Sequence, residues 1–312
     1  MPTIDLTTVA VRPEPAAAPN PIAAAPRRVG LTLAELQLAA RLAGDAPLPF
    51  EVAEPRRTDA MQARLGQSPT ALDDEAYRSA VAALHDPAES LARRGLTDGD
   101  VLDPGVAGAI GLLAAPRFAL DADVSMVGMQ AKVWHRHDGA AVASLATADG
   151  IVFELGWFAT DAWPVELARV AALSEEVAVG HSAVPSYVDL PFELADAAAE
   201  ACTAGRGDLL PVLAARHTGA VRAGAGVLAD DAVVRILGAL SSEAQGRLRA
   251  LVADVSGAAV DTVGVVSWTL LADGWRALRP HHDDGVLRLE VRAAAPDELA
   301  AVVAPALGEV AR

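Results

Sequence analysis

Alternating apolar and polar residues mark a strand near the middle of the chain. In the segment FALDADVSM (118–126), every second residue is apolar, beginning with Phe118 and ending with Met126, and Asp121 and Asp123 lie between them. Successive side chains of a strand point to opposite faces of a sheet, so one face is apolar and the other polar. The pattern predicts a half-buried strand of an antiparallel sheet.

Asp-Gly dipeptides predict four hairpin turns around this strand pattern. They are Asp138-Gly139, Asp149-Gly150, Asp273-Gly274 and Asp284-Gly285. Each lies between apolar stretches, and the dipeptide suits the positive φ angles of tight hairpin turns. The segment RPHHDDG (279–285), which at first sight resembles a set of metal ligands, is therefore interpreted as a strand end and a turn.

The turns repeat at a fixed distance. Both pairs are 11 residues apart, and the second pair is displaced by 135 residues (274 − 139 and 285 − 150). The segments next to the turns also match: GIVFEL with GVLRLE, WPVELARVA with APDELAAVVA, and PLPFEV with DLPFEL, the last at a displacement of 142. The period is too long for a solenoid, so we predict two diverged halves, about 29–175 and 176–312.

Helical spacing and capping residues predict four helices. They begin after Thr32, at 72, after Asp103 and at 161, and end at Gly44, Gly95, before Pro116 and at 173, respectively. Thr32 with Glu35 three residues later is a capping box, and Pro164 stands in a first turn, where proline is tolerated. PLPFEV (47–52) is expected to be extended, and 53–70 to be an exposed, mobile loop.

The charge balance excludes several classes of partner. The chain has 25 Lys and Arg residues against 41 Asp and Glu, a formal net charge of −16, and Lys132 is its single lysine. Binding to nucleic acid or to an anionic membrane surface needs clustered positive charge, so neither is expected. Cys202 is the single cysteine, which favours a reducing, cytoplasmic setting over a disulfide or a structural zinc site.

The first 28 residues form a Pro- and Ala-rich leader. The segment has Asp5 ahead of any basic residue and no apolar run of signal-peptide length, so we expect 1–28 to be poorly ordered. No later stretch carries about 18 uninterrupted apolar residues, the length a membrane span requires. The sequence predicts a cytoplasmic protein without direct membrane insertion.

Histidines are the strongest candidates for metal ligands. His281 and His282 are adjacent, so in a strand they point to opposite faces and do not converge on one ion. His135 and His137 share one face of a predicted strand, and a third ligand such as Asp138 would be needed. For both pairs we favour a solvated position over a metal site, and we expect no metal.

Two short motifs come close to catalytic or cofactor signatures. GHSAV (180–184) has Val184 where a nucleophile elbow around Ser182 needs glycine. GAGVLA (224–229) follows a segment too short and polar to be the first strand of a dinucleotide-binding fold. Neither supports a site, and carboxylate pairs such as Glu175 and Glu176 are expected anywhere in an acidic chain. We therefore predict no catalytic residue, no cofactor and no enzyme.

The order of these signals resembles a known family. LTLAELQLAARLAGDAPLPFEV (31–52), LARRGLTDGDVLDPGVAGAIGLLAAPRFALDADV (91–124), the Asp-Gly hairpins and the closing APDELAAVVAPAL are similar to the EspG family. These proteins are type VII (ESX) secretion-associated chaperones of actinobacteria. The resemblance extends over most of the chain from about residue 29 and rests on the order and spacing of weak signals, because the family has no catalytic motif.

The resemblance implies an α+β fold with a central antiparallel sheet, flanking helical bundles and two pseudo-symmetric halves, built as one domain over 29–312. It implies a cytosolic chaperone that binds the tip of a PE–PPE-like or WXG-type helical pair, keeps it soluble and directs it to its ESX system. We expect client contacts from the 53–70 loop and the sheet, at Arg56, Arg57, Met61, Phe118, Val124 and Trp134. An enzyme with a site between the halves and a self-associating structural protein, such as a homodimer, are the alternatives.

Overall fold

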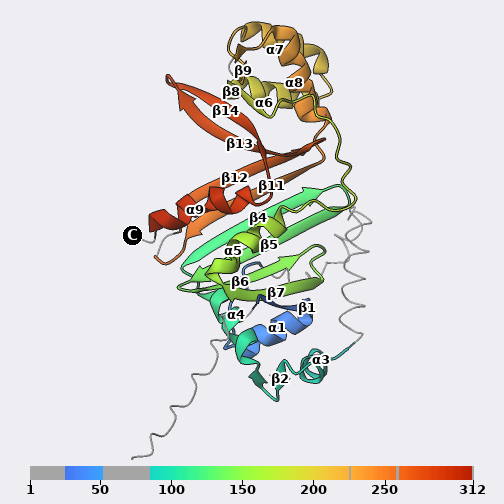
Figure 1. Ribbon diagram of the computed structural model, residues 1–312. Coiled ribbons are helices and arrows are strands. Elements are labelled where there is room, and N and C mark those ends of the chain that lie inside the picture. The colour runs from blue at the N-terminus through green and yellow to red at the C-terminus, as the bar shows by residue number, and fades with distance from the viewer. Residues whose placement is uncertain (1–24, 52–84, 225, 258–259, 311–312) are drawn as a thin grey trace, which may run out of the picture.

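The computed structural model describes residues 25–51, 85–224, 226–257 and 260–310, and its centre is one large antiparallel sheet (Figure 1). The sheet has twelve strands in the order β1-β7-β6-β5-β4-β11-β12-β13-β14-β8-β9-β10. Their bounds are β1 Arg27–Thr32, β4 Phe118–Met126, β5 Met129–Asp138, β6 Ala141–Thr147, β7 Val152–Ala159, β8 Tyr187–Pro191, β9 Arg222–Ala223, β10 Gly226–Val227, β11 Gly246–Asp254, β12 Asp261–Leu271, β13 Gly274–Asp283 and β14 Val286–Ala294. Two short strands, β2 (Thr97–Asp98) and β3 (Val101–Leu102), pair separately.

Helices flank this sheet, which makes the fold α+β as expected. They are α1 Leu33–Leu42, α3 Pro87–Arg93, α4 Pro104–Ala114, α5 Trp163–Val170, α6 Phe192–Thr203, α7 Leu210–Arg216, α8 Asp230–Ser242 and α9 Glu298–Val310, with short 3₁₀ turns at Thr160–Ala162 and Gly207–Leu209. Within the described residues no helix is long and apolar enough to cross a membrane.

The strand order is symmetric about the pair β4 and β11. On each side a four-strand meander, β4 to β7 or β11 to β14, is completed by a strand from earlier in its own half, β1 or β8, and that strand leads directly into α1 or α6. Ala122 and Ala250, each at the middle of its strand, pair with each other across this junction. The two pseudo-symmetric halves are thus present, and the boundary at 175/176 stays a prediction.

The Asp-Gly dipeptides lie at the four hairpin connections, as predicted. Asp284 and Gly285 form the two-residue turn between β13 and β14, and both have positive φ angles, 49° and 79°. Only a few residue types tolerate this left-handed region, and Asp-Gly is among the favoured pairs for such turns. RPHHDDG is therefore the end of a strand and its turn.

Two of the sequence-based expectations for the first half are wrong. Residues 47–51 of PLPFEV are not a strand, and the segment is not the counterpart of DLPFEL, because DLPFEL spans β8 and the start of α6. The structural counterpart of β8 is β1, which begins at Arg27. Arg27 and Arg28 therefore belong to a strand that pairs with β7, rather than to a disordered leader.

One face of the central strands is covered by α5 and α9, which lie next to each other across it (Figure 1). The hydrophobic core beneath them draws on both halves. It contains Trp163 and Leu167 of α5, Trp268 and Trp275 of the second meander, and Leu299 of α9. The indole N–H of Trp275 donates to the carbonyl of Ala171 at 2.8 Å, so the halves are joined by packing and by hydrogen bonding.

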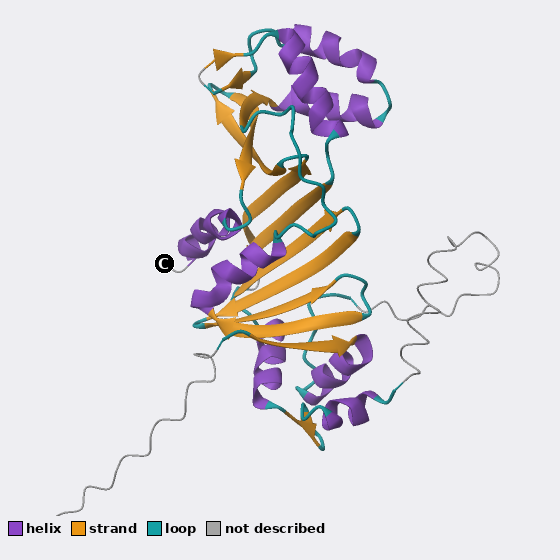
Figure 2. Ribbon diagram, turned by 45° about the vertical axis from the view of Figure 1, so that its right-hand side comes forward, coloured by secondary structure: helices purple, strands orange, loops and turns teal. Residues whose placement is uncertain are grey.

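The opposite face carries a helical bundle at each end (Figure 2). Trp134 of β5 points to this face and packs with α1 and α4 in a second core, whereas its neighbour Val133 belongs to the core under α5 and α9. In the other half Leu278 and Val291 pack with α6, α7 and α8 in a third core. Between the two bundles, the outward side chains of β4, β5, β11 and β12 are left uncovered.

Candidate functional site

The uncovered middle of the sheet is the candidate functional site, and we call it the open face. Its residues come from four neighbouring strands and alternate with core residues along each of them. They are Asp121, Asp123 and Ser125 of β4, Gln130 and Lys132 of β5, Arg247, Arg249 and Leu251 of β11, and Val265, Ser267 and Thr269 of β12. Most of these side chains are exposed.

Charged side chains stand opposite one another across the strands of the open face. Asp123 is the cross-strand partner of Lys132 on β5 and of Arg249 on β11. Asp121 accepts a hydrogen bond from buried Arg136 at 2.6 Å, so its charge is already compensated within the chain. Among the remaining charged residues of the open face, three cations stand against the one carboxylate of Asp123.

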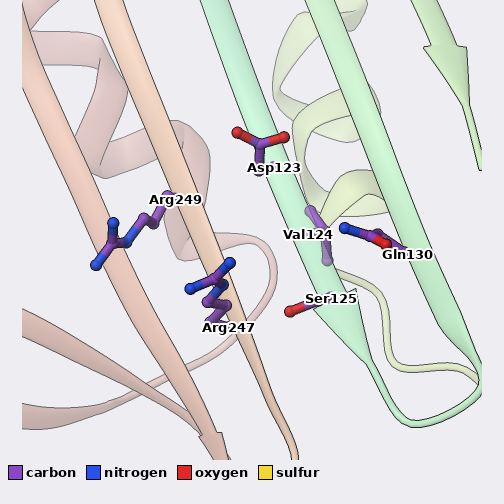
Figure 3. A pocket seen from close by; sticks show the side chains of 6 residues that line it. All are labelled: Asp123, Val124, Ser125, Gln130, Arg247 and Arg249. Carbon is purple, nitrogen blue, oxygen red and sulfur yellow. The ribbon is translucent and has the colours of Figure 1, made fainter. Parts of the chain in front are cut away.

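A shallow hollow lies where β4, β5 and β11 meet (Figure 3). Its volume is about 200 Å³, and it is lined by Asp123, Val124, Ser125, Gln130, Arg247 and Arg249. The two arginines come from one strand, and the serine and glutamine face them from the neighbouring strands. The hollow offers hydrogen-bond donors and positive charge to a group that rests on it.

An apolar pair adjoins the charged residues. Leu251 of β11 and Val265 of β12 are cross-strand partners, and 42% of Leu251 and 72% of Val265 is exposed. Single exposed apolar residues are ordinary on protein surfaces, but two neighbouring ones beside unpaired charges are typical of a protein-binding patch with a polar rim. The open face is suited to bind another macromolecule by contact.

The residues predicted to contact a client are placed differently from this face. Arg56, Arg57 and Met61 lie outside the described residues, so nothing is added to that prediction. Phe118 and Val124 are 3% and 1% exposed and point into the core under α5 and α9. Trp134 faces the open side but is 8% exposed, because Phe50 packs on it with ring centroids 5.2 Å apart. Direct contact by these three stays a prediction, and their exposed strand neighbours form the open face.

His135 and His137 lie in an aromatic cluster on the covered face, rather than at a solvated site. The Nδ1 atom of His135 accepts a hydrogen bond from the indole of Trp163 at 2.7 Å, and the ring of His137 stacks on that indole at 5.1 Å. Burial, aided by Arg136 and Arg169, lowers the pKa of His135 to about 3. Its imidazole is neutral at pH 7.

His281 reaches one carboxylate, on the edge of the second half. Its Nε2 atom lies 3.1 Å from Asp189, which also accepts from buried Arg288 at 2.9 Å. His282, its neighbour, is exposed and belongs to the other face of the strand. Over the described residues no group of three or more His, Cys, Asp or Glu side chains could hold a metal ion.

The two motif-like segments have structural contacts of their own. The hydroxyl of Ser182 donates to Glu243 at the end of α8, and the segment around it is neither strand nor helix, unlike a nucleophile elbow. GAGVLA contains β10, which is antiparallel to β9, and the helix that follows begins with Asp230 and Asp231. Carboxylates at that helix start would repel a phosphate.

Comparison with known proteins clarifies the fold. No protein-family model matches the chain, and no curated protein matches it in sequence. A solved structure, the Mycobacterium tuberculosis type VII secretion system chaperone EspG5 in complex with a PE25–PPE41 dimer, matches with a TM-score of 0.59. The match covers 90% of this chain and 96% of the other, at 15% identity. The chain has an EspG-like fold.

The EspG-like fold accounts for the arrangement described above. The resemblance found in the sequence is confirmed at the level of architecture, since 90% of the chain takes part in the match. Identity of 15% carries no individual residue from one protein to the other. Which residues of this EspG-like chain act must therefore be argued from its own open face.

Proposed function

We propose that the protein is a type VII secretion chaperone that binds a PE–PPE-like helical pair on the open face. The observation that carries this proposal is the match to EspG5, whose structure was solved with a PE25–PPE41 dimer. In the proposed complex, binding keeps the pair soluble and directs it to its ESX system. The protein acts in the cytoplasm of an actinobacterium, without catalysis.

The open face supports this proposal on physical grounds. It is an uncovered floor between two helical bundles, so a client can contact strands and helices at once (Figure 2). Its polar side chains and its apolar pair suit a reversible interface, which is only about as apolar as the rest of a protein surface. A client with exposed apolar residues at its tip would bury them there.

Catalysis and self-association are the alternatives from different classes. A site between the halves would have to lie along the β4–β11 junction, where His135 and His137 face the opposite side of the sheet. A self-associating protein would use the same open face for a second copy of the chain. Light scattering of the purified protein separates this case, because its mass would be twice that of one chain.

Co-expression tests the proposed function directly. The full chain is co-expressed with candidate PE–PPE-like and WXG-type pairs from the same genome, and the products are resolved by size-exclusion chromatography with light scattering. The proposal predicts one discrete complex of one chaperone with one pair. Absence of a complex with every pair, together with a dimer of the chain alone, would favour the homodimer.

Substituting Val265 tests whether the open face is the contact. Val265→Asp places a charge in the apolar part of the proposed interface, and we expect complex formation to weaken by about 2 kcal/mol or more, roughly thirtyfold. Val165→Asp is the matched control, since Val165 is 70% exposed but lies on α5 at the covered face. Equal binding by both variants and the wild type would exclude this face.

A further inference from the structure

Arg247 and Arg249 form a pair of cations on the open face. Both are exposed, both lie on the same side of β11, and they are two residues apart, which spaces their Cα atoms by about 7 Å along the strand. Ser125 and Asp123, their cross-strand partners on β4, line the same hollow (Figure 3). On the other side they are flanked by Thr269 and Ser267.

Their lack of a charge partner contrasts with the other arginines of the fold. Ten arginines form ion pairs with carboxylates: Arg28, Arg94, Arg136, Arg169, Arg206, Arg222, Arg235, Arg276, Arg288 and Arg292. Arg247 and Arg249 form no ion pair with the described residues, although acidic residues are in large excess in the chain. Two neighbouring guanidinium groups on an uncovered face are available to an anionic partner.

The spacing of the pair selects the kind of anion. Residues four apart on an α-helix are about 6 Å apart along its axis and lie on one face, close to the spacing of the two arginines. A helix that lies along β11 can therefore present two carboxylates, one to each guanidinium. Polyanions such as nucleic acid are disfavoured by the net charge of −16 on the whole chain.

We propose that Arg247 and Arg249 recognise a client helix that carries two carboxylates one turn apart. This inference rests on the proposed function and deepens it by naming the chemistry of the client. The arginines bind the carboxylates through charge-assisted hydrogen bonds, and Ser125 and Gln130 supply further donors from the floor of the hollow. The contact fixes where along β11 the client helix lies.

A peptide titration tests this chemistry independently of any cellular client. The probe is an alanine-based helical peptide of about 20 residues with two glutamates four residues apart, and its control has glutamines instead. We expect the side-chain Nε–Hε NMR signals of Arg247 and Arg249 in the full chain to shift with the glutamate peptide only. Equal shifts with both peptides, or shifts at Arg93 and Arg279 as large as those at the pair, would overturn the inference.

The second test uses the client pair recovered by co-expression. The double variant Arg247→Gln/Arg249→Gln should bind that pair about 10- to 100-fold more weakly and with less dependence on NaCl. Arg93→Gln/Arg279→Gln removes the same charge from the exposed end of α3 and from the covered side of β13, and should bind as the wild type does. Unchanged affinity of the first variant would overturn the inference and leave the proposed function intact. Arginine shifts with the peptide, but no complex with any pair, would overturn the proposed function alone.

Discussion

At the scale of single residues, the buried histidine of the aromatic cluster shows how the fold sets a protonation state. His135 is 2% exposed, and its Nδ1 atom must be unprotonated to accept the hydrogen bond from Trp163. Burial is the main reason that its pKa is about 3, against about 6.5 in an unfolded chain. Folding therefore excludes a proton that the unfolded chain binds in mild acid.

This difference predicts a pH dependence of stability. Because the folded-state pKa is depressed, the contribution of His135 is complete above pH 6.5 and falls by about 1.4 kcal/mol per pH unit as the pH decreases towards 3. Urea unfolding of the wild type and of His135→Gln at pH 7, 6 and 5 isolates this contribution. The gap between the two proteins should shrink as the pH falls; parallel curves would contradict the prediction.

At the scale of elements, the paired helices α1 and α6 are started in different ways. Thr32 caps α1 by accepting from the backbone N–H of Glu35, whose own carboxylate accepts from the Thr32 backbone at 2.8 Å. In the second half Pro191 precedes α6 and makes no side-chain cap. Burial alone would raise the pKa of Glu35, but hydrogen bonds from Ser90, Thr32 and Arg94 outweigh it and lower the pKa.

Removing the Thr32 cap should destabilise the protein measurably. Thr32→Ala leaves an N–H of the first turn without its partner, and we expect the free energy of unfolding to fall by about 1 kcal/mol. Thr203→Ala, at the exposed C-terminal end of α6, is the control and should change stability by less than about half of that. Urea denaturation compares the two, and equal losses would show that the cap contributes nothing of its own.

Local signals explain which elements could be predicted. The capping box, the Asp103 cap of α4 and the Asp-Gly turns lie within a few residues of sequence, so the pattern alone identified them. β1 was missed because it is short and becomes a strand by pairing with β7, with Arg27 opposite Trp157. The four letters LPFE matched between the halves without structural equivalence, since so short a match carries little information.

At the scale of the whole molecule, the open face could not be found from one segment. The alternation in GRLRALVAD (246–254) indicates which side chains of β11 are polar, but not that β11 lies beside β4. Strands of different halves meet there, and pairing over such sequence separation leaves no local trace. Phe118 and Val124 were predicted from the right strand, β4, but point to its covered face.

The shared core predicts that the two halves unfold together. Trp163 and Trp268 come from different halves but lie in one continuous core under α5 and α9. Gly246 strengthens this coupling, because a Cβ atom there would come within 2.3 Å of the Ser125 carbonyl across the β4–β11 junction. Urea unfolding followed by tryptophan fluorescence and by far-UV circular dichroism should give coincident single transitions. Two separate transitions would show that each half is stable alone.

The pairing of Ala122 with Ala250 has a consequence for orientation. A two-fold axis between these residues exchanges Asp121 with Arg249 and Asp123 with Leu251, so the equivalent positions of β4 and β11 differ in charge. A frame built from two similar halves would otherwise accept a rod-like guest in either of two directions, related by half a turn. Carboxylates on one side of the axis and guanidinium groups on the other remove that degeneracy, and give a nearly symmetric molecule a single direction of docking.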